Sequence, residues 1–416
     1  WTKARTANDF GMFEETLDRC FKTVAEVAAA RGKTADADLY STCLDEYERG
    51  MEAARIEELF GEVEAQLRPL IQRVLDSPIA PSELPLTDKS ADKPADKTAG
   101  DAAGEAASFP IEAQEQLSKE VVNAMGFPDG RRIDVSVHPF TTSFGPADVR
   151  ITSRFREDEW YQGLAGSVHE CGHALYESQL RDTGLPLDTA MSMGTHESQS
   201  LFWERHVGLS RPFWTWCGPR VRETLGSDFS DEELYGAVNR VTQGLIRVEA
   251  DELTYPMHVI LRYRLEAKLL RGELAVSELP LEWRRGMKEL LGVDGDTYDD
   301  DKGCLQDVHW SGLAVGYFPT YLLGAMMAAQ LDHFVRHDKS FAEAQGGRSV
   351  DQLIEAGEFA PFKAWLKEKI HDHGSLFESM DELLMHSFGE PLNPKYFIDY
   401  LTNKYEALYQ LEELDK

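Results

Sequence analysis

The 416-residue chain carries a formal net charge of −30 and has a pI near 4.8, with 42% hydrophobic and 28% charged residues. This composition indicates a folded globular protein and excludes a disordered one. The excess of carboxylates excludes nucleic acid as a partner, because phosphate binding needs clustered Lys and Arg.

Helical spacing of apolar residues predicts two long antiparallel helices between residues 10 and 75, with Gly32 between them. Residues 81–110 contain few bulky apolar side chains and repeat an Ala-Asp-Lys theme, which predicts a flexible loop. Helical spacing resumes at residues 111–127. In residues 131–155, β-branched residues alternate with polar ones around a Gly-Pro turn, which predicts a small hairpin.

Nearly everything after the predicted hairpin has helical spacing. The longest apolar stretch, residues 317–331, contains Pro319, Thr320 and Gln330, so it predicts a buried helix and no membrane span. We therefore expect one large, mainly α-helical domain over residues 1–416, with a small β element and no membrane partner.

The stretch "HECGH", residues 169–173, follows the predicted hairpin. Positions four apart lie on one face of a helix, so His169 and His173 can direct imidazole nitrogens at one point. That spacing suits zinc, and Glu170 is placed to act as general base on a water molecule. The same pattern also arises by chance in structural helices, so a third ligand has to be found.

The predicted helix has an apolar face that can pack inward, formed by Leu164, Val168, Cys171 and Leu175. Cys171 belongs to this face and points away from His169, so we assign it no metal role. Gly172 allows close approach of a neighbouring element.

A catalytic zinc ion takes three protein ligands and keeps a fourth position open. Tyr176 and Gln179 stand where metzincins need Gly and His, which excludes that arrangement. Glu197 lies on the next predicted helix, for which Thr195 is the expected N-cap. Its rival, Glu177, lies a further turn along the first helix and is poorly placed for the same ion. We predict Glu197 as the third ligand.

Six separated motifs, in this order, resemble the carboxypeptidase Taq family of zinc metallocarboxypeptidases. They are "HPF" (138–140), "DVRIT" (148–152), "HECGH" (169–173), "HESQ" (196–199), "IRVEAD" (246–251) and "GCLQDVHW" (303–310). The resemblance covers the chain from near Trp1 to its end. Family members usually carry a further N-terminal helical segment that is absent from this sequence.

The resemblance implies that His169, His173 and Glu197 bind Zn²⁺, or Co²⁺ or another divalent ion, and that Glu170 activates the water. It also implies a mostly helical body with a deep cleft, similar to neurolysin and angiotensin-converting enzyme. Members of the family tend to be homodimers, so we expect a homodimer.

A carboxypeptidase must recognise a free C-terminal carboxylate, whose two oxygens match the fork of a guanidinium. Arg150 and Arg247 are the candidates, and the resemblance favours Arg247. Each also has a structural alternative. Arg150 can form an ion pair with Asp148, and Arg247 can form one with Glu249 or Asp251.

Peptide hydrolysis builds negative charge on the former carbonyl oxygen, and a donor near the metal helps to stabilise it. In related peptidases a His and a Tyr from this region have that role, so we predict His309 and Tyr321 as catalytic residues. Tyr317 is close enough in sequence to be the true donor. The resemblance also implies a substrate-side role for His138. Each of these side chains has a structural alternative as a packed or turn residue.

The predicted function is a metal-dependent carboxypeptidase that releases C-terminal amino acids from peptides by attack of a metal-bound water. The alternatives are an endopeptidase or dipeptidyl carboxypeptidase on the same scaffold, or a catalytically inactive peptide-binding protein. Five scattered cysteines are too few for a disulfide framework and predict a cytoplasmic protein. The chain starts at Trp1 without a Met, which allows for an upstream segment.

Overall fold

The computed structural model describes residues 1–32, 38–82, 109–128 and 131–411. Most of the predicted flexible loop, residues 83–108, lies outside the described residues. Within the described ranges, no helix is both long enough and apolar enough to cross a membrane.

Helices make up most of the described chain. The α-helices are α1 (Thr2–Ala7), α2 (Gly11–Arg31), α3 (Leu39–Tyr47), α4 (Ala53–Leu75), α5 (Ile111–Met125), α6 (Tyr161–Gln179), α7 (Met193–Leu201), α8 (Arg211–Leu225), α9 (Asp231–Val238), α10 (Tyr255–Arg271), α11 (Leu279–Leu291), α12 (Phe318–His337), α13 (Lys339–Ala344), α14 (Val350–Glu355), α15 (Ala360–Lys369), α16 (Met380–Phe388) and α17 (Lys395–Leu408). The short helices are the π-helix η1 (Phe202–Gly208) and the 3-10 helices η2 (Arg247–Glu249), η3 (Val276–Glu278), η4 (Gly295–Thr297), η5 (His309–Gly312) and η6 (His371–His373).

Three short strands form one small sheet in the order β1-β3-β2. Strand β2 (Thr141–Ser143) pairs antiparallel with β3 (Val149–Ser153), which confirms the predicted hairpin. Strand β1 (Ile133–Val135) also lies in the predicted β stretch, and it pairs parallel with β3, which a hairpin alone does not include.

Helix α6 lies against the sheet, and it also packs on α5 and α7. The predicted apolar face of α6 is confirmed, because all four of its residues are buried. Gly172 permits the close approach of α7, since a Cβ at this position would lie 2.6 Å from the Ser200 Cα. Helix α6 is therefore fixed on one side by strand β3 and on another by α7.

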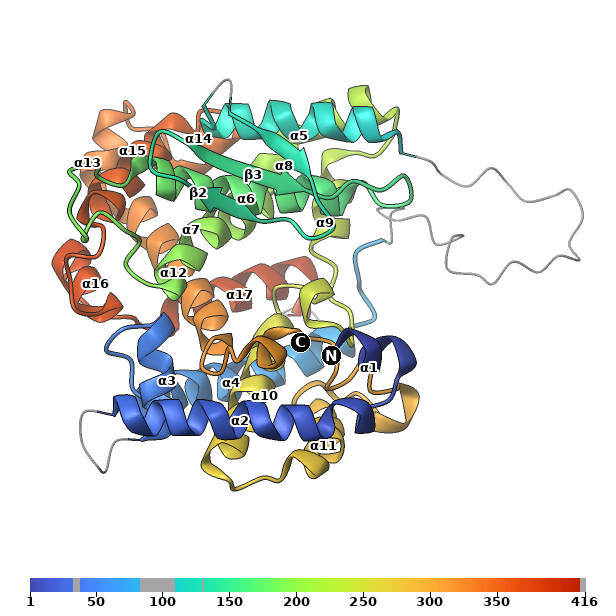
Figure 1. The fold of residues 1–416 in the computed structure, drawn as a ribbon. Helices are drawn as coiled ribbons and strands as arrows, with labels where there is room; N and C mark the ends of the chain where they lie inside the picture. Colours follow the sequence, from blue (N-terminus) through green and yellow to red (C-terminus); the bar gives the residue numbers. More distant parts are fainter. Residues whose placement is uncertain (33–37, 83–108, 129–130, 412–416) are drawn as a thin grey trace, which may run out of the picture.

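The helices α2, α3, α4, α10 and α11 lie on one side of the molecule, and the sheet with α5, α6 and α8 lies on the other (Figure 1). Helices α7, α12 and α17 lie between these two groups, and α12 packs along α7. The mainly α-helical fold with a small β element is thus confirmed. The deep cleft, the likeness to neurolysin and angiotensin-converting enzyme, and the single domain stay predictions.

The prediction of only two helices between residues 10 and 75 was wrong. Helix α3 ends at Tyr47, and Gly50 adopts a φ of 77°, which a helix does not allow. Helix α4 then begins at Ala53. The break places Glu48 in the interior, where its carboxylate accepts a hydrogen bond from the Gly194 backbone N–H at the start of α7.

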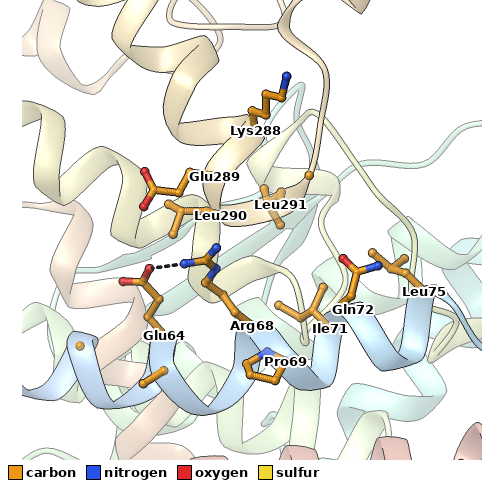
Figure 2. Close-up of a pocket in the computed structure, with 13 residues that line it drawn as sticks. Glu64, Arg68, Pro69, Ile71, Gln72, Leu75, Lys288, Glu289, Leu290 and Leu291 are labelled. Carbon is orange, nitrogen blue, oxygen red and sulfur yellow. Dashed lines mark hydrogen bonds and ion pairs between the residues drawn. The ribbon is translucent and has the colours of Figure 1, made fainter.

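A surface hollow of about 740 Å³ lies between α4 and the end of α11 (Figure 2). Its wall includes the ion pair between Arg68 and Glu64, whose closest N and O atoms are 3.3 Å apart. None of the predicted site residues lines this hollow.

Candidate metal centre

His169 and His173 on α6 converge with Glu197 on α7, as the sequence predicted. The ligand atoms of these three residues all lie within 4.8 Å of one another, and they form the one such group within the described ranges. The Glu197 Oε2 lies 3.8 Å from the His169 Nε2 and 3.5 Å from the His173 Nε2. Two imidazole nitrogens and a carboxylate oxygen are a donor set suited to zinc and similar divalent ions. The residues therefore fit a metal.

The charges around this triad favour a cation at its centre. Burial opposes ionisation of Glu197, but the neighbouring His169 and His173 outweigh it and lower the pKa of Glu197 to about 2. Burial likewise disfavours protonated His169, but Glu197 and Glu204 outweigh it and raise the pKa of His169 to about 10. Burial and the neighbouring His196 lower the pKa of His173. A group of carboxylates that attracts a proton this strongly also attracts a divalent cation.

The His169 ring is oriented by a residue that sequence reasoning missed. Glu204 in η1 lies with its Oε2 2.5 Å from the His169 Nδ1. An Nδ1–H that donates to this carboxylate leaves the Nε2 directed at the triad, where its lone pair binds an ion once the Nε2 proton is released. Sequence spacing gave no signal for Glu204, because it comes from a π-helical stretch after α7 rather than from a motif.

Glu170 is buried on α6 beside the first histidine. Thr141 of β2 donates a hydrogen bond of 2.6 Å from its Oγ1 to the Glu170 Oε2. The same hydroxyl lies 3.0 Å from the Glu170 backbone oxygen. Sequence reasoning missed Thr141 as well. Strand β2 therefore fixes the carboxylate that was predicted as the general base.

Glu177, the rival third ligand, does not join the triad but contacts His196, which precedes Glu197 on α7. The His196 Nε2 lies 2.8 Å from the Glu177 Oε1, and its Nδ1 lies 2.6 Å from the His173 Nδ1. His196 is the first residue of the "HESQ" motif, but the sequence analysis predicted no role for it.

Helix α7 begins three residues earlier than predicted. Ser192, rather than Thr195, is the N-cap, and its Oγ accepts a hydrogen bond from the Thr195 backbone N–H. Glu197 consequently lies in the second turn and not in the first. Serine and threonine are both favoured at the N-cap, so N-cap propensity alone did not distinguish Ser192 from Thr195.

Tyr321 and His309 form a pair, with 3.0 Å between the Tyr321 hydroxyl and the His309 Nε2. Burial raises the pKa of Tyr321 well above its usual range, so the hydroxyl keeps its proton. Burial and the Arg247 charge lower the pKa of His309 to about 4, so the imidazole is neutral near pH 7. Tyr317 packs its ring 5.4 Å from that of Tyr321 and 5.6 Å from that of His309. All three residues therefore lie in one aromatic cluster.

Tyr321 is linked to the triad through α12. Gly324 lies one helical turn after Tyr321 and packs directly on Glu197. The Glu197 charge also raises the pKa of both Tyr317 and Tyr321, after the larger effect of burial. The predicted donor groups thus lie near the triad.

Arg247 forms its ion pair with Asp307, so the alternative partners proposed from sequence, Glu249 and Asp251, were wrong. Its Nη2 lies 2.9 Å and its Nε 3.1 Å from the Asp307 Oδ1. The guanidinium is buried and lies 4.7 Å from the centre of the Tyr321 ring. Asp307 also accepts a hydrogen bond from Arg262, so two cations face one carboxylate.

Arg150 and His138 lie near the small sheet and do not join this cluster. Arg150 on β3 pairs with Asp148 through its Nε and Nη2, each at 2.8 Å, as the structural alternative predicted. His138 is exposed between β1 and β2, and its backbone oxygen accepts a hydrogen bond from Ser136.

Comparison with known proteins identifies the family of the chain. The profile of the family described as carboxypeptidase Taq (M32) metallopeptidase matches residues 1–405. The chain belongs to this family. Carboxypeptidase 1 of Bacillus subtilis is 36% identical to the chain over 99% of it and 77% of the relative. The thermostable carboxypeptidase 1 of Thermus thermophilus is 39% identical over 98% of the chain and 77% of the relative.

Solved structures give the same result. The carboxypeptidase of Pyrococcus furiosus superposes with a TM-score of 0.87 at 34% identity, covering 97% of this chain and 76% of that one. Membership of the M32 family confirms the main prediction of the sequence, a metal-dependent carboxypeptidase. The family also implies a divalent metal ion, for which the triad on α6 and α7 supplies a fitting donor set.

Proposed function

We propose that His169, His173 and Glu197 hold one divalent ion, with Glu170 as the general base for hydrolysis of the last peptide bond. The observation that carries this proposal is the convergence of the three ligand atoms within 4.8 Å. When bound, the ion acts as a Lewis acid that polarises the scissile carbonyl and acidifies the attacking water. Zn²⁺ is the proposed ion, and Co²⁺ or another divalent ion is the alternative.

Glu170 takes the proton from the attacking water on one of its carboxylate oxygens and then delivers it to the leaving amine. The hydrogen bond from Thr141 to the Glu170 Oε2 supports this role, because it holds one oxygen and leaves the other for the water. Glu170 follows His169 directly on α6, so the base lies beside the metal ligands without being one of them.

Tyr321 donates a hydrogen bond from its hydroxyl to the oxyanion that develops on the scissile carbonyl. The pair with His309 supports this role: a neutral imidazole that donates from its Nε2 to the Tyr321 oxygen leaves the hydroxyl hydrogen free for the substrate. Tyr317, in the same cluster, is the alternative donor and a substrate-binding candidate.

Arg247 binds the free C-terminal carboxylate of the peptide. Asp307 carries one negative charge against the two guanidinium groups of Arg247 and Arg262, so the cluster keeps a net positive charge that attracts a carboxylate. Arg150 and His138 remain further substrate-binding candidates. Peptides with a free C-terminus are the proposed substrates.

The family resemblance further supports a homodimer. A cytoplasmic location is proposed because the five cysteines, all in the described part of the chain, are free. The net charge of −30 supports the absence of a nucleic-acid partner.

The proposal is tested with an N-blocked dipeptide in two forms, one with a free C-terminal carboxylate and one amidated. We expect the free form to be cleaved, a chelator to abolish cleavage, and Zn²⁺ or Co²⁺ to restore it. Glu170→Gln should retain the metal and lose about 10²–10⁴-fold in kcat. Equal cleavage of both forms would indicate an endopeptidase, release of dipeptides from longer substrates a dipeptidyl carboxypeptidase, and no cleavage by the metal-loaded protein an inactive peptide-binding protein.

A further inference from the structure

Three side chains form a hydrogen-bonded chain that ends on one of the metal ligands. Glu177 contacts the His196 Nε2 at 2.8 Å, and the His196 Nδ1 contacts the His173 Nδ1 at 2.6 Å. All three side chains are mostly buried, with exposed fractions of 20%, 18% and 14% for Glu177, His196 and His173. Little water therefore competes for these hydrogen bonds.

The order of donors in this chain follows from the two ends. A carboxylate only accepts, so the His196 Nε2 must carry the hydrogen that lies toward Glu177. In a neutral imidazole the other nitrogen is then an acceptor, so the His196 Nδ1 accepts from the His173 Nδ1–H. The Nε2 of His173 is left with a free lone pair, and this nitrogen lies 3.5 Å from the Glu197 Oε2 in the triad.

The packing of α6 against α7 holds these three side chains in place. His173 and Glu177 lie one turn apart on α6, while His196 and Glu197 are consecutive residues of α7. The His196 ring lies 4.5 Å from that of His173 and 5.4 Å from that of Tyr176, so it is held between them.

Strand β2 anchors the outer end of the chain. Thr141 and Ser143 lie on one face of this strand. Thr141 donates a hydrogen bond to Glu170 of α6, and Ser143 is among the neighbours that lower the pKa of Glu177, after the larger effect of His196. Strand β2 therefore contacts α6 both at Glu170, the proposed general base, and near Glu177, where the hydrogen-bonded chain of Glu177, His196 and His173 begins. We call this chain the relay.

The two histidine ligands are oriented differently. His169 meets the Glu204 carboxylate directly, whereas His173 meets an imidazole whose own tautomer has to be fixed by Glu177. Carboxylates, backbone carbonyls and water are the usual acceptors for the outer nitrogen of a ligating histidine. An imidazole acceptor in that position works only if its second nitrogen donates elsewhere.

We propose that His196 and Glu177 are positioning residues that hold His173 in the Nδ1–H tautomer, with the Nε2 lone pair directed at the ion. This inference rests on the proposed metal site formed by His169, His173 and Glu197. It predicts that the hydrogen-bonding pattern at position 196, rather than an imidazole as such, sets the affinity for the metal.

The test measures the Zn²⁺ dissociation constant of the full, metal-stripped chain by competition with a chromophoric chelator. His196→Leu should weaken Zn²⁺ binding about 10–100-fold, the usual effect of removing a group that orients a ligand. His196→Asn supplies one donor and one acceptor, so it should recover most of the affinity. Glu177→Leu should weaken binding as His196→Leu does, and it serves as the second variant if His196→Leu does not fold.

His371→Leu is the matched control. His371 contacts Gln179 at the end of α6 and Gln199 on α7, each at 2.8 Å, and packs on the face of Tyr176 at 4.9 Å. Its loss removes a buried imidazole between the same two helices without touching a metal ligand. We expect it to lower the melting temperature of the metal-free protein and to leave the Zn²⁺ dissociation constant unchanged.

The visible absorption of the Co²⁺-loaded protein provides a second readout, since reorientation of one imidazole in His196→Leu changes the ligand field. Full Zn²⁺ affinity in His196→Leu, or an affinity of His196→Asn no better than that of His196→Leu, would overturn the relay. If the parent protein takes up no stoichiometric Zn²⁺, the proposed metal site fails first. If the parent binds one equivalent and both position-196 variants match it, only the relay fails.

Discussion

Glu197 packs so closely on Gly324 that a Cβ added at position 324 would lie 2.7 Å from the Glu197 Cβ. Helix α12 therefore supports the proposed third metal ligand through a glycine. We predict that Gly324→Ala displaces Glu197 and weakens Zn²⁺ binding by at least about tenfold. A small shift of one ligand atom distorts the coordination geometry around the ion. Chelator competition on the metal-stripped protein measures this effect.

Gly61→Ala is the control for this substitution. Gly61 lies inside α4, and a Cβ there would meet nothing within 4 Å. Alanine at this position should raise the free energy of unfolding by about 0.5–1 kcal/mol and leave the Zn²⁺ affinity unaltered. Unaltered affinity in Gly324→Ala as well would show that α12 does not position Glu197.

Thr141 is predicted to set the orientation of the general base. Thr141→Val preserves the shape of the side chain and removes the hydrogen bond of 2.6 Å to the Glu170 Oε2. A hydrogen bond to a charged group contributes about 1.5–3 kcal/mol, so kcat should fall about tenfold or more while the bound metal stays at one equivalent. Thr141→Ser should keep most of the activity. A Thr141→Val protein with the kcat of the parent would argue against this role.

Arg247 and Arg150 are the two candidates for the residue that binds the substrate carboxylate, and matched substitutions distinguish between them. Arg247→Lys removes the guanidinium fork from the cluster with Asp307, and we expect kcat/KM for the free-carboxylate peptide to fall about 100-fold. Arg150→Lys, next to Asp148 on the small sheet, should have a much smaller effect. The reverse ranking would assign the carboxylate to Arg150.

The buried carboxyl group of Glu266 predicts that the free energy of unfolding depends on pH. It is buried on α10 and accepts hydrogen bonds from Tyr40, Trp310 and the Gly316 backbone N–H. Burial raises the pKa of Glu266 from 4.5 to about 7. A carboxyl group whose pKa is raised by folding stabilises the folded state below pH 4.5, and this contribution is lost as the pH rises through 7.

The corresponding measurement is the free energy of unfolding of the parent and of Glu266→Gln between pH 4 and pH 8. The neutral amide does not titrate, so the parent should lose up to about 3 kcal/mol relative to the variant over this interval. Taking the difference cancels the titration of all other groups. A difference that does not change with pH would contradict the raised pKa.

Local spacing was enough to predict the centre of the site. His169, Glu170 and His173 lie within one turn of α6, and their relative positions follow from helical geometry alone. Glu197 was found because the chemistry of the metal requires a third ligand. The apolar face of α6 and the close approach at Gly172 were also predicted from the sequence. The first depends on helical periodicity and the second on the small size of glycine.

The groups that orient Glu170 and the triad were not predicted, because their contacts depend on tertiary packing. Thr141 lies on a three-residue strand, Glu204 in a π-helical stretch, and neither position follows from the spacing of a motif. The break between α3 and α4 was also missed. Helical spacing continues on both sides of it, while the left-handed Gly50 and the burial of Glu48 end the helix.

Titration of the metal-stripped protein with Zn²⁺, beside Glu197→Ala, is the most direct test of the three-ligand site. The parent should bind one equivalent, and X-ray absorption of the loaded protein should show two imidazole nitrogens and a carboxylate oxygen around the ion. Glu197→Ala should lose most of this affinity while staying folded. Equally tight binding by Glu197→Ala, or a coordination shell without two imidazoles, would contradict the account.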